Sequence, residues 1–104
     1  MWTLEQAQKL IAELEPAVRE LHYHTLLGGG VLHRGSSDKD LDIWFMPLNG
    51  YECDSRPIVR LLFGVFAKMR PLRDSPDYVV DALWHLQDAY VGEYNGKRVD
   101  LFIQ

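Results

Sequence analysis

The sequence has a single cysteine, Cys53, and no long run of apolar residues. One cysteine cannot form an internal disulfide, which excludes the small extracellular scaffolds that disulfides hold together. No segment reaches the roughly 20 apolar residues that a membrane-spanning helix needs, and no early segment resembles a signal peptide. We therefore expect a soluble, cytoplasmic protein that does not bind membranes.

Basic residues are also few: the sequence has 11 Lys and Arg against 15 Asp and Glu, which gives a net charge of -4. This balance argues against a nucleic-acid binder that relies on a broad basic surface. It is compatible with an acidic site that recruits a divalent cation. The 104 residues are 47% hydrophobic, which is enough for one core, so we expect a single domain over residues 1–104.

Apolar spacing predicts two helices. Thr3 and Gln6 have the spacing of a capping box, and apolar residues at helical intervals follow as far as Leu21, with a possible kink at Pro16. A second helix is predicted from residue 58 to residue 69, ending before Pro71.

Four strands are predicted at residues 23–28, 41–46, 89–94 and 97–103. The last two flank Asn95-Gly96, a dipeptide favoured in two-residue hairpin turns. Residues 78–88 show no clear period, and we favour a short helix or an irregular segment there. The expected fold is α+β, with a short mixed or antiparallel sheet flanked by helices.

Glycines precede two aspartates in the segment from Gly28 to Asp42. Because strand side chains alternate between faces, Asp40 and Asp42 are expected to share one face, about 7 Å apart, where they can bind hard cations. Asp is uncommon in strands, and two neighbouring carboxylates are costly to bury unless a cation separates them. The alternative is a turn rich in Gly, Ser and Asp for purely conformational reasons.

A third carboxylate, Asp100, lies in the apolar segment 97–103. If this strand pairs beside the strand of Asp40 and Asp42, three carboxylates meet and are enough to hold two divalent ions. Trp44, Phe45, Trp84 and Tyr90 offer a stacking face for a base, although aromatic residues on strands more often belong to a core.

These residues resemble the motif of the nucleotidyltransferase superfamily, typified by DNA polymerase beta, tRNA CCA-adding enzymes and the minimal nucleotidyltransferases. That motif has a hydrophobic residue before Gly and Gly or Ser, then Asp-hydrophobic-Asp/Glu-hydrophobic, and later an acidic residue between hydrophobic ones. The matching segments here are Leu27-Gly28-Gly29, Asp40-Leu41-Asp42-Ile43 and Val99-Asp100-Leu101. The resemblance extends over residues 20–104.

The resemblance implies an enzyme that transfers a nucleoside monophosphate from a triphosphate such as ATP to a hydroxyl group, using two Mg²⁺ ions. It assigns catalysis and metal binding to Asp40, Asp42 and Asp100. It assigns nucleotide binding to backbone and hydroxyl donors at Gly28, Gly29, Gly30, Ser36 and Ser37. The acceptor stays open among a protein hydroxyl, a nucleic-acid 3′ end and a small molecule.

Two departures from the family leave a second hypothesis open. Many members have Ser after the motif glycine, whereas this chain has Gly29, and most continue into a further domain, whereas this sequence ends four residues after Asp100. The group that receives the nucleotide is therefore expected to be held by a protein partner, by a second copy of the chain, or by nothing beyond this domain. The alternative function is an inactive nucleotide-sensing or partner-binding module on the same fold, for example a toxin-antitoxin component.

Overall fold

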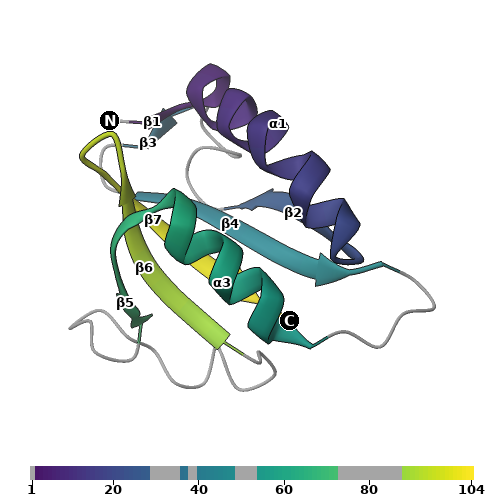
Figure 1. The fold of residues 1–104 in the computed structure, drawn as a ribbon. Coiled ribbons are helices and arrows are strands. Elements are labelled where there is room, and N and C mark those ends of the chain that lie inside the picture. The colour runs from purple at the N-terminus through teal and green to yellow at the C-terminus, as the bar shows by residue number, and fades with distance from the viewer. Residues whose placement is uncertain (1, 29–35, 38–39, 49–53, 73–87) are drawn as a thin grey trace.

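The computed structural model describes residues 2–28, 36–37, 40–48, 54–72 and 88–104 (Figure 1). Its two helices are α1 (Leu4–Glu20) and α3 (Ser55–Val65). A five-stranded sheet is formed by β2 (Tyr23–Gly28), β4 (Asp40–Pro47), β5 (Ala67–Pro71), β6 (Asp88–Tyr94) and β7 (Lys97–Ile103). Two short strands, β1 (Trp2–Thr3) and β3 (Ser36–Ser37), pair with each other. The predicted α+β class with a mixed sheet is confirmed.

The strand order of the sheet is β2-β4-β7-β6-β5. Strands β4 and β7 are parallel neighbours, and the other neighbouring pairs are antiparallel. Parallel neighbours need a long crossover connection, and the chain between β4 and β7 contains α3, β5 and β6. This crossover places two segments that are far apart in the sequence side by side at the centre of the sheet.

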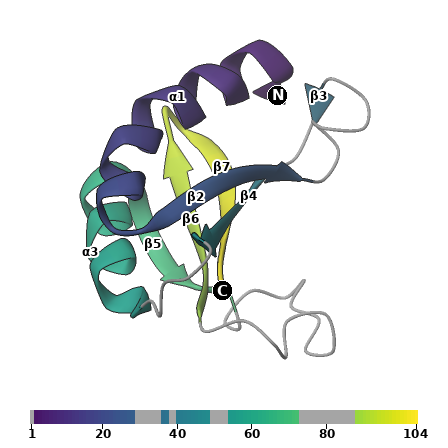
Figure 2. The ribbon, with the colours of Figure 1, turned by 90° about the vertical axis from the view of Figure 1, so that its right-hand side faces the viewer.

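Both helices lie on the same side of the sheet (Figure 2). Buried side chains of the helices meet fully buried side chains of β4 and β7 in one apolar cluster. The central strands contribute Leu41, Ile43, Phe45, Val99, Leu101 and Ile103. Because strand side chains alternate, Asp42, Trp44, Asp100 and Phe102 lie on the opposite face of the sheet. We call this second face, which neither helix covers, the outer face.

The capping box at the start of α1 is confirmed. The Gln6 backbone N–H donates to Thr3 Oγ1 at 3.2 Å, and the Thr3 N–H donates to Gln6 Oε1 at 3.1 Å. The helix continues through Pro16 to Glu20 without interruption. No helix in the described part of the chain is long and apolar enough to cross a membrane.

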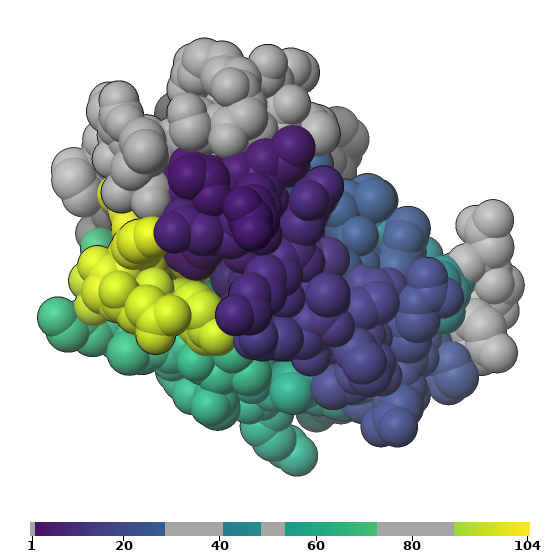
Figure 3. All heavy atoms as spheres, turned by 90° about the horizontal axis from the view of Figure 1, so that it is seen from above, coloured from purple at the N-terminus to yellow at the C-terminus, as the bar shows by residue number. Residues whose placement is uncertain are grey.

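The N-terminal half of α1 lies against the turn between β6 and β7 (Figure 3). Lys97 Nζ donates to Gln6 Oε1 at 3.1 Å, and the Tyr94 hydroxyl donates to Glu13 at 3.1 Å. The bond to the Glu13 carboxylate raises the pKa of Tyr94 above its usual value. The predicted hairpin is confirmed, and Asn95 and Gly96 have φ values of 53° and 77°, both positive as its tight turn requires.

The second helix was predicted to extend to residue 69, and this prediction was wrong. Helix α3 ends at Val65, and residues 67–71 form the edge strand β5 instead. Lys68 has a φ of 54°, and a register shift between Ala67 and Arg70 marks a bulge against β6. The side chain of Met69 packs over Gly92, in the space that a side chain on Gly92 would occupy. Met69 therefore fits the apolar spacing of a helix but is part of a strand. The predicted segment 78–88 falls mostly outside the described residues.

Candidate functional site

Three strands bring Gly28, Asp42 and Asp100 into one row across the outer face. Gly28 is the register partner of Asp42 between β2 and β4, and Asp42 is the register partner of Asp100 between β4 and β7. Neighbouring strands lie about 4.8 Å apart, so the two carboxylates start from adjacent backbone positions. The strand of Asp100 therefore pairs beside the strand of Asp42, which is the condition under which three carboxylates were expected to meet. We call Gly28, Asp42 and Asp100 the carboxylate row.

The side chain of Arg98 contacts the carboxylate row and offsets the repulsion between its two negative charges. Asp100 is only 6% exposed, and Asp42 is half-buried. Two unit charges about 5 Å apart repel by about 3 kcal/mol at an effective dielectric constant near 20. Arg98 Nε donates to Asp100 Oδ1 at 2.9 Å and Nη2 donates to Oδ2 at 3.5 Å. The guanidinium therefore supplies positive charge where a bound cation would supply it.

Gly28 provides space beside the carboxylates. A Cβ atom at this position would lie 3.2 Å from Trp44 Nε1, 3.3 Å from Trp44 Cδ1 and 3.9 Å from Asp42 Cβ. Contacts below 3.4 Å are tight, so a larger residue would press on the indole and narrow the approach to Asp42. A larger residue at position 28 would therefore fit only if the indole of Trp44 moved by a few tenths of an ångström.

The remaining predicted site residues are placed only in part. Asp40 begins β4 and is the register partner of Arg98, two positions before the carboxylate row. The backbone of Ser36 and Ser37 pairs with β1. Gly29 and Gly30 lie outside the described residues, as do most residues of the loop between β2 and β4.

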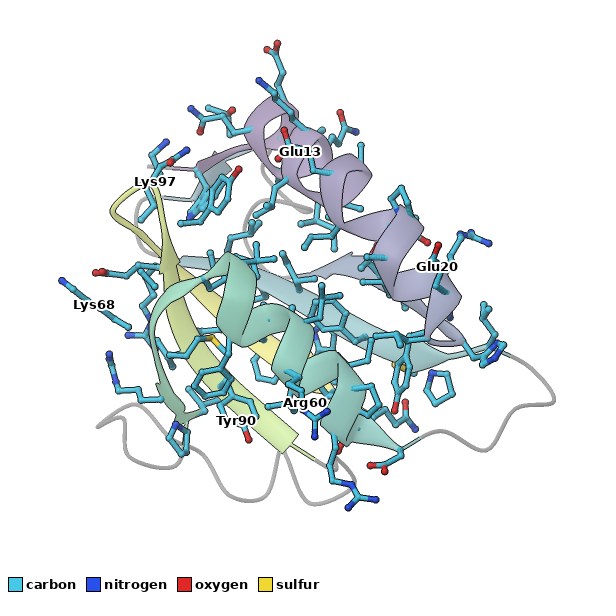
Figure 4. All side chains as sticks on the ribbon, viewed as in Figure 1. Glu13, Glu20, Arg60, Lys68, Tyr90 and Lys97 are labelled. Atoms are coloured by element: carbon cyan, nitrogen blue, oxygen red, sulfur yellow. The ribbon has the colours of Figure 1, made fainter. Side chains whose placement is uncertain are left out.

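The aromatic residues divide between the two faces. Phe45 is fully buried in the core, and Tyr90 lies beside α3, with its ring 5.8 Å from that of Phe63 (Figure 4). Trp84 lies outside the described residues. Trp44 is on the outer face and stacks on Phe102, with ring centroids 4.6 Å apart and planes 21° apart. Of the residues considered for stacking, Trp44 is therefore the one beside the carboxylate row.

Sequence reasoning missed Arg98 and Phe102. Each lies two positions from Asp100 on β7, so strand alternation puts both on the same face as that carboxylate. The signal was present in the segment 97–103, because the alternation that puts Asp40 and Asp42 on one face puts Arg98, Asp100 and Phe102 on one face as well.

The donor chemistry of the carboxylate row fits a hard cation. Mg²⁺ is usually bound by one or two carboxylates, with water and substrate phosphates as its other ligands. Asp42 and Asp100 provide two such carboxylates from adjacent positions. No cluster of three or more His, Cys, Asp or Glu side chains suited to a metal occurs among the side chains that the structure describes, which do not include that of Asp40.

Comparison with family models, with curated proteins and with solved structures found no match to this chain.

Proposed function

We propose that the chain is a magnesium-dependent nucleotidyltransferase whose active site is the carboxylate row together with Asp40. The observation that carries the proposal is the register of β4 and β7, which pairs Asp42 with Asp100 beside Gly28. The sequence resemblance joins the same three positions in one motif. The strand pairing brings together residues that the motif singles out in the sequence.

In the proposed reaction Asp40, Asp42 and Asp100 would hold two Mg²⁺ ions together with the triphosphate. Magnesium, when bound, neutralises phosphate charge and lowers the pKa of the acceptor hydroxyl. Asp40 and Asp42 would orient the triphosphate, and Asp100 would orient the acceptor oxygen toward the α-phosphorus. The glycine-rich turn allows backbone N–H groups to approach the phosphates.

The bond changes follow the usual course of nucleotidyl transfer. The acceptor oxygen forms a bond to the α-phosphorus, and the bond from that phosphorus to the oxygen of the β-phosphate breaks. Pyrophosphate leaves, and the proton of the acceptor hydroxyl passes to solvent. The acceptor hydroxyl in this reaction can belong to a protein, to a nucleic-acid 3′ end or to a small molecule.

Thermal unfolding tests the binding half of this proposal. With magnesium, a nucleoside triphosphate at about 100 times its dissociation constant should stabilise the fold by about 2.7 kcal/mol, seen as a higher melting temperature. The four common triphosphates are measured in parallel, each with magnesium and with a chelator. No shift with any of them would contradict the proposal.

Label transfer separates the enzyme from the sensing module. Label from an α-labelled triphosphate should appear on an acceptor from cell extract, whereas label from a γ-labelled one should not. Binding without transfer would favour a nucleotide-sensing or partner-binding module.

Replacing Arg98 by methionine should make stability depend on magnesium. Removing a partner of a nearly buried carboxylate is expected to cost about 1–3 kcal/mol in the free energy of unfolding, measured by urea titration in chelator. Added Mg²⁺ should recover part of this loss, because the cation replaces the guanidinium charge near Asp100. The matched control is Arg19→Met, since Arg19 is an exposed arginine that also pairs with a carboxylate, that of Glu15. The proposed metal site is refuted if magnesium changes both variants equally.

A further inference from the structure

A strip of apolar side chains runs beside the carboxylate row on the outer face. Leu26 is the register partner of Trp44, and Trp44 is the register partner of Phe102. Each of these residues lies two positions from a member of the carboxylate row, a step of about 7 Å along its strand. We call Leu26, Trp44 and Phe102 the aromatic strip.

The aromatic strip is partly open to solvent, although its residues are large and apolar. Leu26 is 45% exposed, and Trp44 and Phe102 are half-buried. The two rings stack on each other, so their mutual contact already fixes their orientation. A rigid aromatic pair with accessible surface can bind a flat ring without being reorganised.

Trp44 also borders the carboxylate row directly. Its Nε1 and Cδ1 atoms lie 3.2 and 3.3 Å from the place where a side chain on Gly28 would begin. Because Gly28 has no side chain, nothing on that residue separates the indole from the space beside Asp42. The polar row and the apolar strip therefore form one continuous surface.

The chemistry of a nucleotide matches this continuity. Its phosphates are anionic and bind carboxylates through cations. Its base is a flat ring, and each of the four bases can stack on an aromatic side chain. The sugar holds the base a few ångströms from the α-phosphate. A triphosphate bound at the carboxylate row thus has its base within reach of Trp44.

We propose that Trp44, held in place by Phe102, stacks against the nucleobase of the bound triphosphate. This inference rests on the proposed function, since it takes the phosphates to be at the carboxylate row. Stacking without base-edge contacts distinguishes the four bases poorly, so the strip raises affinity for all four triphosphates and contributes little base preference.

Isothermal titration of two ligands tests the inference. Magnesium ATP and magnesium tripolyphosphate, which has the phosphates but no base, are titrated into wild type and into Trp44→Leu. Wild type should bind ATP more tightly than tripolyphosphate. Trp44→Leu should weaken ATP binding about fivefold or more and leave tripolyphosphate binding unchanged.

Two further variants serve as controls. Trp44→Phe keeps an aromatic face and should retain most of the affinity for ATP. Phe63→Leu makes a similar change at an aromatic residue that is 51% exposed on α3, on the helix side of the sheet, and should change neither affinity.

Several outcomes would overturn the inference. Equal weakening of both ligands by Trp44→Leu would assign Trp44 to the structure of the site, and no weakening of either would leave it without a role in binding. Equal affinity of wild type for ATP and tripolyphosphate contradicts stacking without any variant. Failure of wild type to bind either ligand contradicts the proposed function itself, and the stacking inference with it.

Discussion

Replacing Asp42 by asparagine is expected to lower transfer of α-label at least about a hundredfold, because the central carboxylate of the row is lost. Asp42 is the only member with register partners in the row on both sides, Gly28 on β2 and Asp100 on β7. The substitution keeps the size of the side chain and removes one of two like charges. The free energy of unfolding should therefore not fall.

The measurement is transfer from α-labelled ATP in the presence of cell extract, with folding checked by urea titration. Asp54→Asn is the matched control, because Asp54 is an exposed carboxylate at the N-terminus of α3 and asparagine also caps helices well. Transfer should be unchanged in this control. A folded Asp42→Asn protein with wild-type transfer would refute the mechanism.

Replacing Phe45 by alanine is expected to cost about 3–5 kcal/mol in the free energy of unfolding. Its side chain is fully buried on the helix side of β4, the strand that carries Asp42 and Trp44 on its outer face. Domains of this kind have only about 5–15 kcal/mol of stability in total. The substitution is therefore expected to remove a large part of the free energy of unfolding. Unfolded molecules of the variant should not bind nucleotide.

Urea titration followed by circular dichroism measures this loss. Phe63→Ala is the control, because Phe63 is 51% exposed and its removal should cost less than about 1 kcal/mol. Similar losses in the two variants would contradict the assignment of Phe45 to the core.

Local signals in the sequence predicted much of the fold. The capping box of Thr3 and Gln6 predicted the start of α1, and Asn95-Gly96 predicted the hairpin of β6 and β7. Alternation of Asp and apolar residues predicted the outer face of β4. These features depend on interactions between residues that are close in the sequence, so a single sequence contains them.

The features that were missed depend on distant partners. The end of α3 was misplaced because Phe66 and Met69 continue a helical spacing, while pairing with β6 decides that residues 67–71 form a strand. The contact between Trp44 and Phe102 had the same limit, because it depends on the pairing of β4 with β7. Phe45, by contrast, follows Leu41 and Ile43 into the core by strand alternation alone.

The register that pairs Asp42 with Asp100 could be predicted only in part from the sequence. The pairing of the two strands was stated from the sequence only as a condition, and a shift of one residue would have moved Asp100 to the core face. The observed register keeps both carboxylates on the outer face. Alternation within β7 puts Arg98 on that face as well, with its Nε 2.9 Å from Asp100 Oδ1. The order of the strands and the exact pairing were therefore needed to define the candidate site.

The central claim is that the carboxylate row binds a divalent cation with a nucleotide. Paramagnetic Mn²⁺, added in small amounts with ATP while backbone amide signals are recorded by NMR, tests it most directly. We expect selective broadening of the signals of Gly28, Asp42 and Asp100, with those of α3 broadened less, because the effect falls steeply with distance from Mn²⁺. Broadening centred on other carboxylates, such as Glu13 or Asp54, or no selective broadening at all, would contradict it.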